Sequence, residues 1–233
     1  NKSRLTDTEQ PLMILINAYM HSGSTFTGEL LGHRRDSFYV YEPLWKLAKE
    51  EFFNGTDQVC NIVVPKCGSP TEKSSFKQAI KILSDIYQCN FDSFEKSVLA
   101  HFTARKSGGS FSSFVDCNEK EGNNCVQELK KSCISARHIV TKVLRLSVSN
   151  LKILLDSFKN MKIVHLFRDP RAMIWSRIRS WFWFEREDSL MKSHLAAQCT
   201  RMLSDYKEGL KLLKEYPGRF RFLIYEDMMD DRT

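Results

Sequence analysis

The stretch with the clearest potential for chemistry runs from Leu12 to Gly32. It consists of an apolar run, a short loop of glycine and hydroxyl residues, and a segment with helical spacing. A buried strand that leads into a turn and a helix start leaves backbone N–H groups unpaired, and the helix dipole favours negative charge there. We therefore predict an anion site at the backbone N–H groups of Gly23 to Phe26.

Two other interpretations of this loop are possible. A strand–turn–helix unit without a ligand has the same pattern, and short motifs often match by chance. A nucleotide-binding loop of the type Gly-x-x-x-x-Gly-Lys-Ser/Thr fits the separation of Gly23 and Gly28, but the next residue is Glu29. A carboxylate in place of the phosphate-binding lysine repels a nucleotide, so the sequence argues against an ATPase of this type.

Two more polar residues are predicted at the carboxyl ends of strands, where open α/β sheets bind ligands. Glu42 ends a strand that begins at Ser37, and Arg168 follows the strand Met161 to Phe167. Each also has a simpler interpretation. A lone glutamate at a strand end is usually solvated, and an arginine at a helix start often pairs with a neighbouring carboxylate, here Asp169 or Glu226.

The elements that position these residues alternate between strands and helices, which predicts parallel strands joined by right-handed crossovers. We expect a helix opened by Pro43 that runs through Phe52, and a helix opened by Pro170 with Asp169 as its N-cap. The other expected elements are strands at Leu12–Ile16, Ser37–Glu42, His138–Lys142, Met161–Phe167 and Arg221–Glu226, and helices at Phe76–Tyr87, Ser149–Phe158 and Ser193–Glu215, the last with Leu195, Cys199, Met202, Leu203, Tyr206, Leu210 and Leu213 in the core.

Composition narrows the class of protein. The 233 residues are 42% hydrophobic, enough for one sizeable α/β core, so we expect a single domain over 1–233. The net charge of +7 suits an acidic partner, but the Lys and Arg residues are scattered, which favours anionic small molecules and glycans over nucleic acid. No run of about 18 apolar residues is present, so we expect no membrane span within the chain.

Cysteine placement indicates the compartment. Six of the seven cysteines lie between Cys60 and Cys133, and Cys199 lies outside this segment. Six cysteines in a loop-rich segment predict three disulfides of unspecified pairing and an oxidising compartment, whereas their spacing does not resemble a zinc site. We interpret residues 54–137 as a cysteine-rich, mostly helical insertion. Two glycosylation sequons, at Asn1 and Asn54, also fit a lumenal protein.

Five motifs in order resemble the carbohydrate sulfotransferases, most closely the Golgi enzymes that sulfate the 6-hydroxyl of galactose, N-acetylglucosamine or N-acetylgalactosamine. The motifs are Ser22-Gly-Ser-Thr-Phe-Thr-Gly-Glu-Leu30, Tyr41-Glu-Pro43, Thr141-Lys-Val-Leu-Arg-Leu146, Val164-His-Leu-Phe-Arg-Asp-Pro-Arg-Ala172 with Ser176-Arg177, and Tyr225-Glu-Asp-Met228. The resemblance covers nearly the whole chain and is weakest in the cysteine-rich segment. It implies a three-layer parallel sheet of the P-loop type, flanked by helices.

The resemblance also implies a donor, 3′-phosphoadenosine 5′-phosphosulfate, a glycan acceptor and no metal. Arg168 and Ser176 match the family's 3′-phosphate site. The 5′-phosphosulfate would be held by the first loop, made of Ser22, Gly23, Ser24, Thr25 and Phe26.

For in-line transfer of a sulfuryl group we expect Glu42 to act as the base, as in related enzymes with a Glu-Pro context. The family usually has arginine immediately before the Ser-Gly-Ser sequence, but this chain has His21. Either His21 acts as a cation in the mildly acidic Golgi, or Lys142, in a position resembling a lysine of related enzymes, supplies most of the positive charge.

The remaining expectations concern the protein as a whole. The resemblance places it in the Golgi lumen, as the soluble portion of a type II membrane protein that is truncated at both ends and anchored through a segment before Asn1. His21 and the early end at Thr233 keep a non-catalytic nucleotide- or glycan-binding lumenal protein as the alternative. A protein-tyrosine sulfotransferase is a more distant option. We expect the aromatic run Trp181 to Phe184 to pack against helices, with Trp181 or Trp183 near the acceptor, and His165 to be a buried strand residue.

Overall fold

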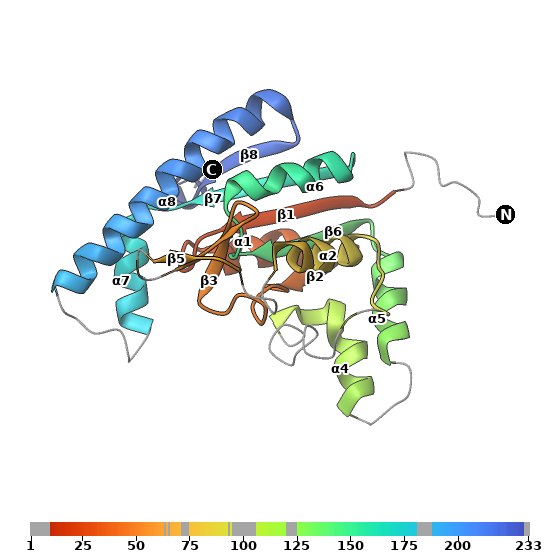
Figure 1. Ribbon diagram of the computed structural model, residues 1–233. Coiled ribbons are helices and arrows are strands. Elements are labelled where there is room, and N and C mark those ends of the chain that lie inside the picture. The colour runs from red at the N-terminus through yellow and green to blue at the C-terminus, as the bar shows by residue number, and fades with distance from the viewer. Residues whose placement is uncertain are drawn as a thin grey trace.

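The computed structural model describes residues 10–62, 64, 66–70, 75–92, 94, 106–119, 125–180 and 188–230. In them, five parallel strands form a central sheet in the order β2-β6-β1-β7-β8 (Figure 1). These strands are β1 (Leu12–Ala18), β2 (Ser37–Tyr41), β6 (His138–Val143), β7 (Met161–Phe167) and β8 (Phe220–Ile224). The predicted α/β class with a parallel central sheet is confirmed.

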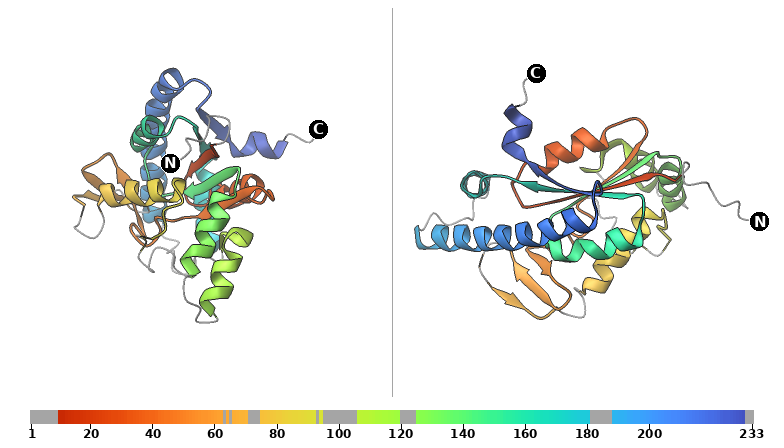
Figure 2. Two further views of the ribbon diagram at one scale, coloured as in Figure 1. Left: turned by 90° about the vertical axis from the view of Figure 1, so that its right-hand side faces the viewer. Right: turned by 90° about the horizontal axis from the view of Figure 1, so that it is seen from above.

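Helices cover both faces of this sheet (Figure 2). On one face lies α1 (Ser24–Gly32), and on the other lie α2 (Phe76–Tyr87), α6 (Lys152–Ser157) and α8 (Asp188–Glu215). Successive side chains of a strand point to opposite faces, so Leu15 of β1 packs in the larger core with Leu83 and Leu154, whereas Ile16 packs with Val140 beside α1. Two further helices, α7 (Pro170–Ser180) and α9 (Tyr225–Asp230), follow β7 and β8 directly.

The cysteine-rich segment contains three disulfides, as predicted. Cys60–Cys67 joins β4 (Gln58–Asn61) to β5 (Cys67–Gly68), which with β3 (Glu51–Asn54) form an antiparallel sheet that the sequence did not reveal. Cys117–Cys125 joins α4 (Ser112–Glu119) to α5 (Cys125–Ile134), and Cys89–Cys133 ties the end of α2 to α5. Cys199 is free and exposed.

The same segment protects the edge strand β2. The N–H groups of Tyr39 and Tyr41 donate to the hydroxyls of Ser110 and Ser107, at 2.8 and 2.9 Å. Ser107 directly precedes the short 3₁₀ helix η1 (Gly108–Phe111), and Ser110 lies in it. Two of the outward-facing N–H groups of an edge strand are thereby satisfied, which reduces the tendency of that edge to pair with other chains.

The helix predicted from Pro43 through Phe52 is wrong. A series of turns follows Glu42, and Phe52 lies in β3 instead. The next residue, Phe53, donates its N–H to Arg145 O at 2.8 Å and accepts from Ser147 N at 2.9 Å. This pairing with the segment after β6 holds the chain extended, so a tertiary contact overrides the local pattern.

Three other expectations need correction. The helix expected at Ser149–Phe158 divides into the 3₁₀ helix η2 (Val148–Leu151) and α6. The last strand ends at Ile224, so Glu226 belongs to α9. Helix α8 begins before Ser193, and much of its predicted core face is exposed, including Cys199, Leu203, Tyr206 and Leu210; its buried residues include His194, Gln198, Asp205 and Leu212.

No helix of the described part of the chain is both long and apolar enough to cross a membrane.

Candidate functional site

The candidate residues meet where four neighbouring strands end at the same edge of the sheet. The loop containing His21 follows β1, Glu42 follows β2, Lys142 lies near the end of β6, and Arg168 follows β7. Because all four strands are parallel and adjacent, their carboxyl ends lie together, as a ligand site in an open α/β sheet requires.

The backbone of the first loop turns sharply at Gly23. This residue has φ 87°, in the left-handed region that favours glycine, and precedes α1 as its N-cap. No described side chain caps the helix, so the N–H groups of its first turn remain available to an anion. A Cβ at Gly23 would clash with the ring of Tyr225, so a larger residue at this position requires the ring to move.

Three consecutive carbonyl groups before Gly23 are each bound by a donor. Tyr19 O accepts from both the N–H and the hydroxyl of Ser22, at 3.3 and 2.7 Å. Met20 O accepts from Arg177 Nη2 at 3.0 Å, and His21 O accepts from Arg168 Nη1 at 3.1 Å. These bonds fix the peptide planes of the loop and neutralise the negative ends of its dipoles, which preorganises it for an anion.

The side chains of the loop differ in their access to a ligand. Ser22 and Ser24 are buried, and the hydroxyl of Ser22 donates to the backbone, whereas Thr25 and Phe26 are exposed. Thr25 Oγ1 accepts a hydrogen bond from Lys142 Nζ at 3.5 Å. Of the predicted hydroxyl ligands, Thr25 is therefore the one whose exposure and cationic neighbour suit a direct contact with an anion.

Glu42 and Lys142 form a buried ion pair. Lys142 Nζ donates to Glu42 Oε1 at 2.7 Å, and the other carboxylate oxygen lies 3.6 Å from Nη2 of Arg145. Lys142 and Glu42 have only 2% and 7% of their side chains exposed. Burial lowers the pKa of Lys142 below its usual value, and the charge of Glu42 opposes this effect. Lys142 thus links the predicted base to Thr25 of the loop.

Arg168 and Ser176 both reach the loop through His21. Arg168 stacks on Tyr225, with its guanidinium carbon 4.4 Å from the ring centroid, and its buried Nε has no partner among the described residues. The simpler interpretation, an ion pair of Arg168 with Asp169 or Glu226, is not what the structure has: Asp169 pairs with Arg171 at 2.6 Å, and Glu226 accepts from Asp169 N at 3.0 Å.

His21 is held as a neutral side chain in this environment. Its Nδ1 lies 3.0 Å from the hydroxyl of Ser176. Burial, followed by the charges of Arg177, Arg168 and Lys142, lowers the pKa of His21 to about 4. In the protein without donor, burial and these charges therefore favour the neutral form of His21. The assignment of the positive charge to His21 or to Lys142 stays a prediction.

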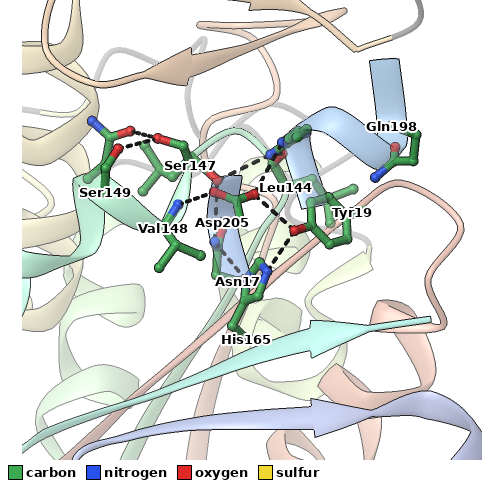
Figure 3. Close-up of polar contacts among 12 residues, drawn as sticks. Asn17, Tyr19, Leu144, Ser147, Val148, Ser149, His165, Gln198 and Asp205 are labelled. Atoms are coloured by element: carbon green, nitrogen blue, oxygen red, sulfur yellow. Dashed lines mark hydrogen bonds and ion pairs between the residues drawn. The ribbon is translucent and has the colours of Figure 1, made fainter. Parts of the chain in front are cut away.

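A buried polar network behind the loop was not predicted (Figure 3). Asn17 Nδ2 donates to Nδ1 of His165 at 3.1 Å, and Tyr19 lies between His165 and Asp205, with its hydroxyl 2.9 Å from each. Because the Tyr19 hydroxyl donates to Asp205, Nε2 of His165 carries a proton and donates to Tyr19. Burial and Arg201 lower the pKa of His165 to about 3, so it is neutral.

This network anchors the loop to α8. Asp205 holds the side chain of Tyr19, and Gln198 Oε1 accepts from Arg177 Nη2 at 2.9 Å, the same nitrogen that binds Met20 O. The sequence contains one signal for this network, the placement of His165 inside a strand. The polar residues of α8 that take part lie between its apolar residues, so the helical pattern did not mark them as buried. The aromatic run Trp181 to Phe184 lies outside the described residues.

These residues fit a ligand with two anionic groups. One group would lie at the uncapped start of α1 beside Thr25 and Lys142, and the other near Arg168, whose buried Nε lacks an acceptor, and Ser176. Within the described residues, no group of three or more His, Cys, Asp or Glu side chains is placed to hold a metal ion.

Comparison with known proteins gives a consistent result. Residues 11–233 match the family described as "Sulfotransferase domain". Carbohydrate sulfotransferase 1 of Danio rerio is 27% identical over 92% of this chain and 58% of its own length. Carbohydrate sulfotransferase 3 of Tetronarce californica is 25% identical over 92% and 54%, and carbohydrate sulfotransferase 6 of Homo sapiens is 24% identical over 94% and 60%. The chain thus spans a little over half the length of these relatives.

Proposed function

The chain belongs to the sulfotransferase domain family, and on this premise we propose that it transfers a sulfuryl group from 3′-phosphoadenosine 5′-phosphosulfate to a hydroxyl of a glycan. The observation that carries the proposal is the meeting of an uncapped helix start, Lys142 and Arg168 at one edge of the sheet. The names of the relatives support a carbohydrate acceptor. We extend the proposal to a 6-hydroxyl of galactose, N-acetylglucosamine or N-acetylgalactosamine, and to a Golgi location with an anchor before this chain.

In this proposal the donor supplies the sulfuryl group, and the chain binds both of its charged ends. The N–H groups of Gly23 to Phe26 and the hydroxyl of Thr25 bind the 5′-phosphosulfate, while Arg168 and Ser176 bind the 3′-phosphate. Lys142 stabilises the charge that builds up on the leaving phosphate.

Glu42 is proposed as the base that accepts the proton of the acceptor hydroxyl. In the protein without donor its Oε1 is bound by Lys142, which also reaches Thr25. An anion beside Thr25 competes with Glu42 for Lys142 and so leaves a carboxylate oxygen able to accept a proton, while Arg145 keeps the carboxylate in place. Assistance by a general base is typically worth about 10²- to 10⁴-fold in rate.

Two measurements test this function. Calorimetry with 3′-phosphoadenosine 5′-phosphate should show binding that Arg168→Gln weakens, and labelled sulfate should be transferred to at least one of a panel of desulfated glycans. Glu42→Gln should then lower turnover by about 10²-fold or more with nucleotide affinity retained. If turnover of Glu42→Gln stays within a few-fold of the parent, Glu42 is not the base.

One observation favours the second candidate, a binding protein without transferase activity. His21 is neutral where the family usually has arginine, so the loop carries one cation fewer. Nucleotide binding without transfer to any glycan of the panel would support this candidate, and absence of both would contradict both.

A further inference from the structure

A cavity lies between the small antiparallel sheet and α8. Its volume is about 330 Å³, near the lower end of the roughly 300–1,000 Å³ found for small-molecule sites. The Cys60–Cys67 disulfide forms part of one wall, and Gln198, Thr200, Arg201 and Ser204 of α8 form part of the other. None of these residues has a role in the proposed binding of the donor.

A buried donor without an acceptor lines this cavity. Nε2 of Gln198 has no hydrogen-bond partner among the described residues, and Gln198 is 2% exposed. Arg201, with 8% of its side chain exposed, already has partners: its Nη2 donates to the carbonyls of Leu144 and Leu146. A buried N–H group without an acceptor costs on the order of 1–3 kcal/mol, so a ligand that brings acceptor oxygens is favoured here. Thr200 and Ser204 add exposed hydroxyls to the same lining.

The wall of the cavity packs against the loop of the candidate site. Met20, which directly precedes His21, packs against Phe52, Cys60 and Ile62 of the cavity wall. Arg177 binds both Met20 O and Gln198 on the opposite wall. A chain of sugars whose reacting hydroxyl lies at the loop would therefore place a neighbouring sugar unit near this cavity.

The charge of the lining favours an anionic group on that unit. Arg201 is paired with Asp205, with Nε and Oδ2 3.6 Å apart. Lys66 is exposed, and the structure gives its side chain no hydrogen-bonding or ionic partner within the described residues. Its ammonium therefore leaves the lining with a net positive charge that carboxylate or sulfate groups would balance.

We propose that this cavity is an acceptor subsite for the sugar unit next to the one that is sulfated, and that it prefers a unit carrying a carboxylate or a sulfate group. The inference rests on the proposed function, because it assigns the acceptor of the same site. Sugar hydroxyls provide an acceptor oxygen for Gln198, and the anionic group pairs with Lys66 at the rim.

The test compares two cavity variants with matched controls. Lys66→Gln removes the charge at the rim, and Lys207→Gln removes the same charge from the exposed surface of α8. Thr200→Trp fills the cavity, and Lys207→Trp adds the same bulk outside it. The probes are three tetrasaccharides: one with glucuronate, a neutral one of galactose and N-acetylglucosamine, and a sulfated form of the latter. Each is measured by acceptor KM and by calorimetry with saturating 3′-phosphoadenosine 5′-phosphate, after enzymatic removal of N-glycans because Asn54 also lines the cavity.

We expect Lys66→Gln to raise KM and Kd by about 3- to 5-fold for the glucuronate or the sulfated probe, the upper part of the effect of an exposed ion pair, and by less than about 2-fold for the neutral probe. The probe that responds identifies the anionic group. Thr200→Trp should raise KM for every acceptor by about 10-fold or more, because a filled cavity excludes the sugar. Nucleotide affinity should stay unchanged in all four variants.

Several outcomes overturn the proposal. If the parent transfers sulfate but both cavity variants keep acceptor KM and Kd within about 2-fold, the subsite is wrong and the proposed function stands. If Lys66→Gln affects neutral and anionic probes equally, the preference for an anionic unit is wrong. If the parent neither binds the nucleotide nor transfers sulfate, the proposed function fails, and direct binding of the tetrasaccharides to parent and variants decides whether a glycan site remains.

Discussion

The buried pair of Glu42 and Lys142 allows a test of whether these two residues act in catalysis or only stabilise the fold. The test uses three variants: Glu42→Gln, Lys142→Met and the double variant. Both side chains are at least nine-tenths buried, and Nζ lies 2.7 Å from Oε1. Each single change leaves the other charge buried without this partner. The double change puts neutral groups of similar size in both places, although Arg145 still loses the carboxylate of Glu42.

The expected magnitudes follow from this burial. Removal of one member of a buried ion pair costs about 3–5 kcal/mol of unfolding free energy, while replacement of both by neutral groups is often close to neutral. Arg145 lies 3.6 Å from the other oxygen of Glu42, so it offsets part of the loss in Lys142→Met but adds to it in Glu42→Gln. We therefore expect Glu42→Gln to be the more destabilising single change, and the double variant to be at least about 2 kcal/mol more stable than the sum of the two predicts.

The assay measures urea unfolding and sulfate transfer on the same four proteins. If Glu42 and Lys142 take part in catalysis, the double variant recovers stability but not turnover, because neither the base nor the cation is present. Recovery of turnover together with stability would show that the pair only supports the fold, and the assignment of Glu42 as base and Lys142 as the leaving-group cation would be refuted. Additive losses of stability would show that the two side chains do not interact in solution.

Two further predictions concern the network and the loop. The pKa of His165 is lowered to about 3, below its unfolded value of about 6.5, so between these pH values the unfolded chain binds more protons and the protein loses stability as the pH drops. The expected loss of unfolding free energy between pH 7 and pH 5 is on the order of 2 kcal/mol. Urea unfolding should show a smaller loss in His165→Gln and the full loss in a variant of the exposed His33, and equal losses in both variants would contradict a neutral, buried His165. Gly23→Ala adds left-handed strain of about 1–2 kcal/mol and a clash with Tyr225, so calorimetry should show nucleotide affinity reduced at least tenfold. Gly218→Ala is the matched control, with φ 75° and nothing within 4 Å of the added Cβ, so unchanged nucleotide affinity in Gly23→Ala as well would mean that the loop is not the anion site.

The central sheet could be predicted from sequence because its strands have local signals. The apolar runs of β1 and β7 are flanked by loop residues, and the structure begins both strands where the sequence predicts. Pro170 opens α7 as expected, and Asp169 Oδ1 accepts from Arg171 N at 2.8 Å. These features depend on neighbours in the sequence, so one sequence suffices to find them.

Features that depend on distant partners could not be predicted. The segment around Phe53 has apolar residues that also suit a helix, and only its backbone pairing with Arg145 and Ser147 makes it a strand. Helix α8 has apolar residues at helical spacing, but its buried side includes Gln198 and Asp205, whose partners lie on α7, on β1's loop and after β6. Periodicity shows which residues share a helix face, but not whether apolar or polar residues pack against that face.

The partners of the cations around the loop explain why Lys142 and Glu42 should act together. Arg168 and Arg177 donate to backbone carbonyls of the loop, contacts that a bound anion need not break, and the Nε of Arg168 has no acceptor among the described residues that the 3′-phosphate would have to replace. Lys142 is bound by a side-chain carboxylate, which an anion at Thr25 can replace as its partner. Binding of the donor would therefore change the state of Glu42 through Lys142. On the proposed function, this coupling would free Glu42 to act as the base when an anion lies beside Thr25, which predicts that the donor binds before the acceptor loses its proton.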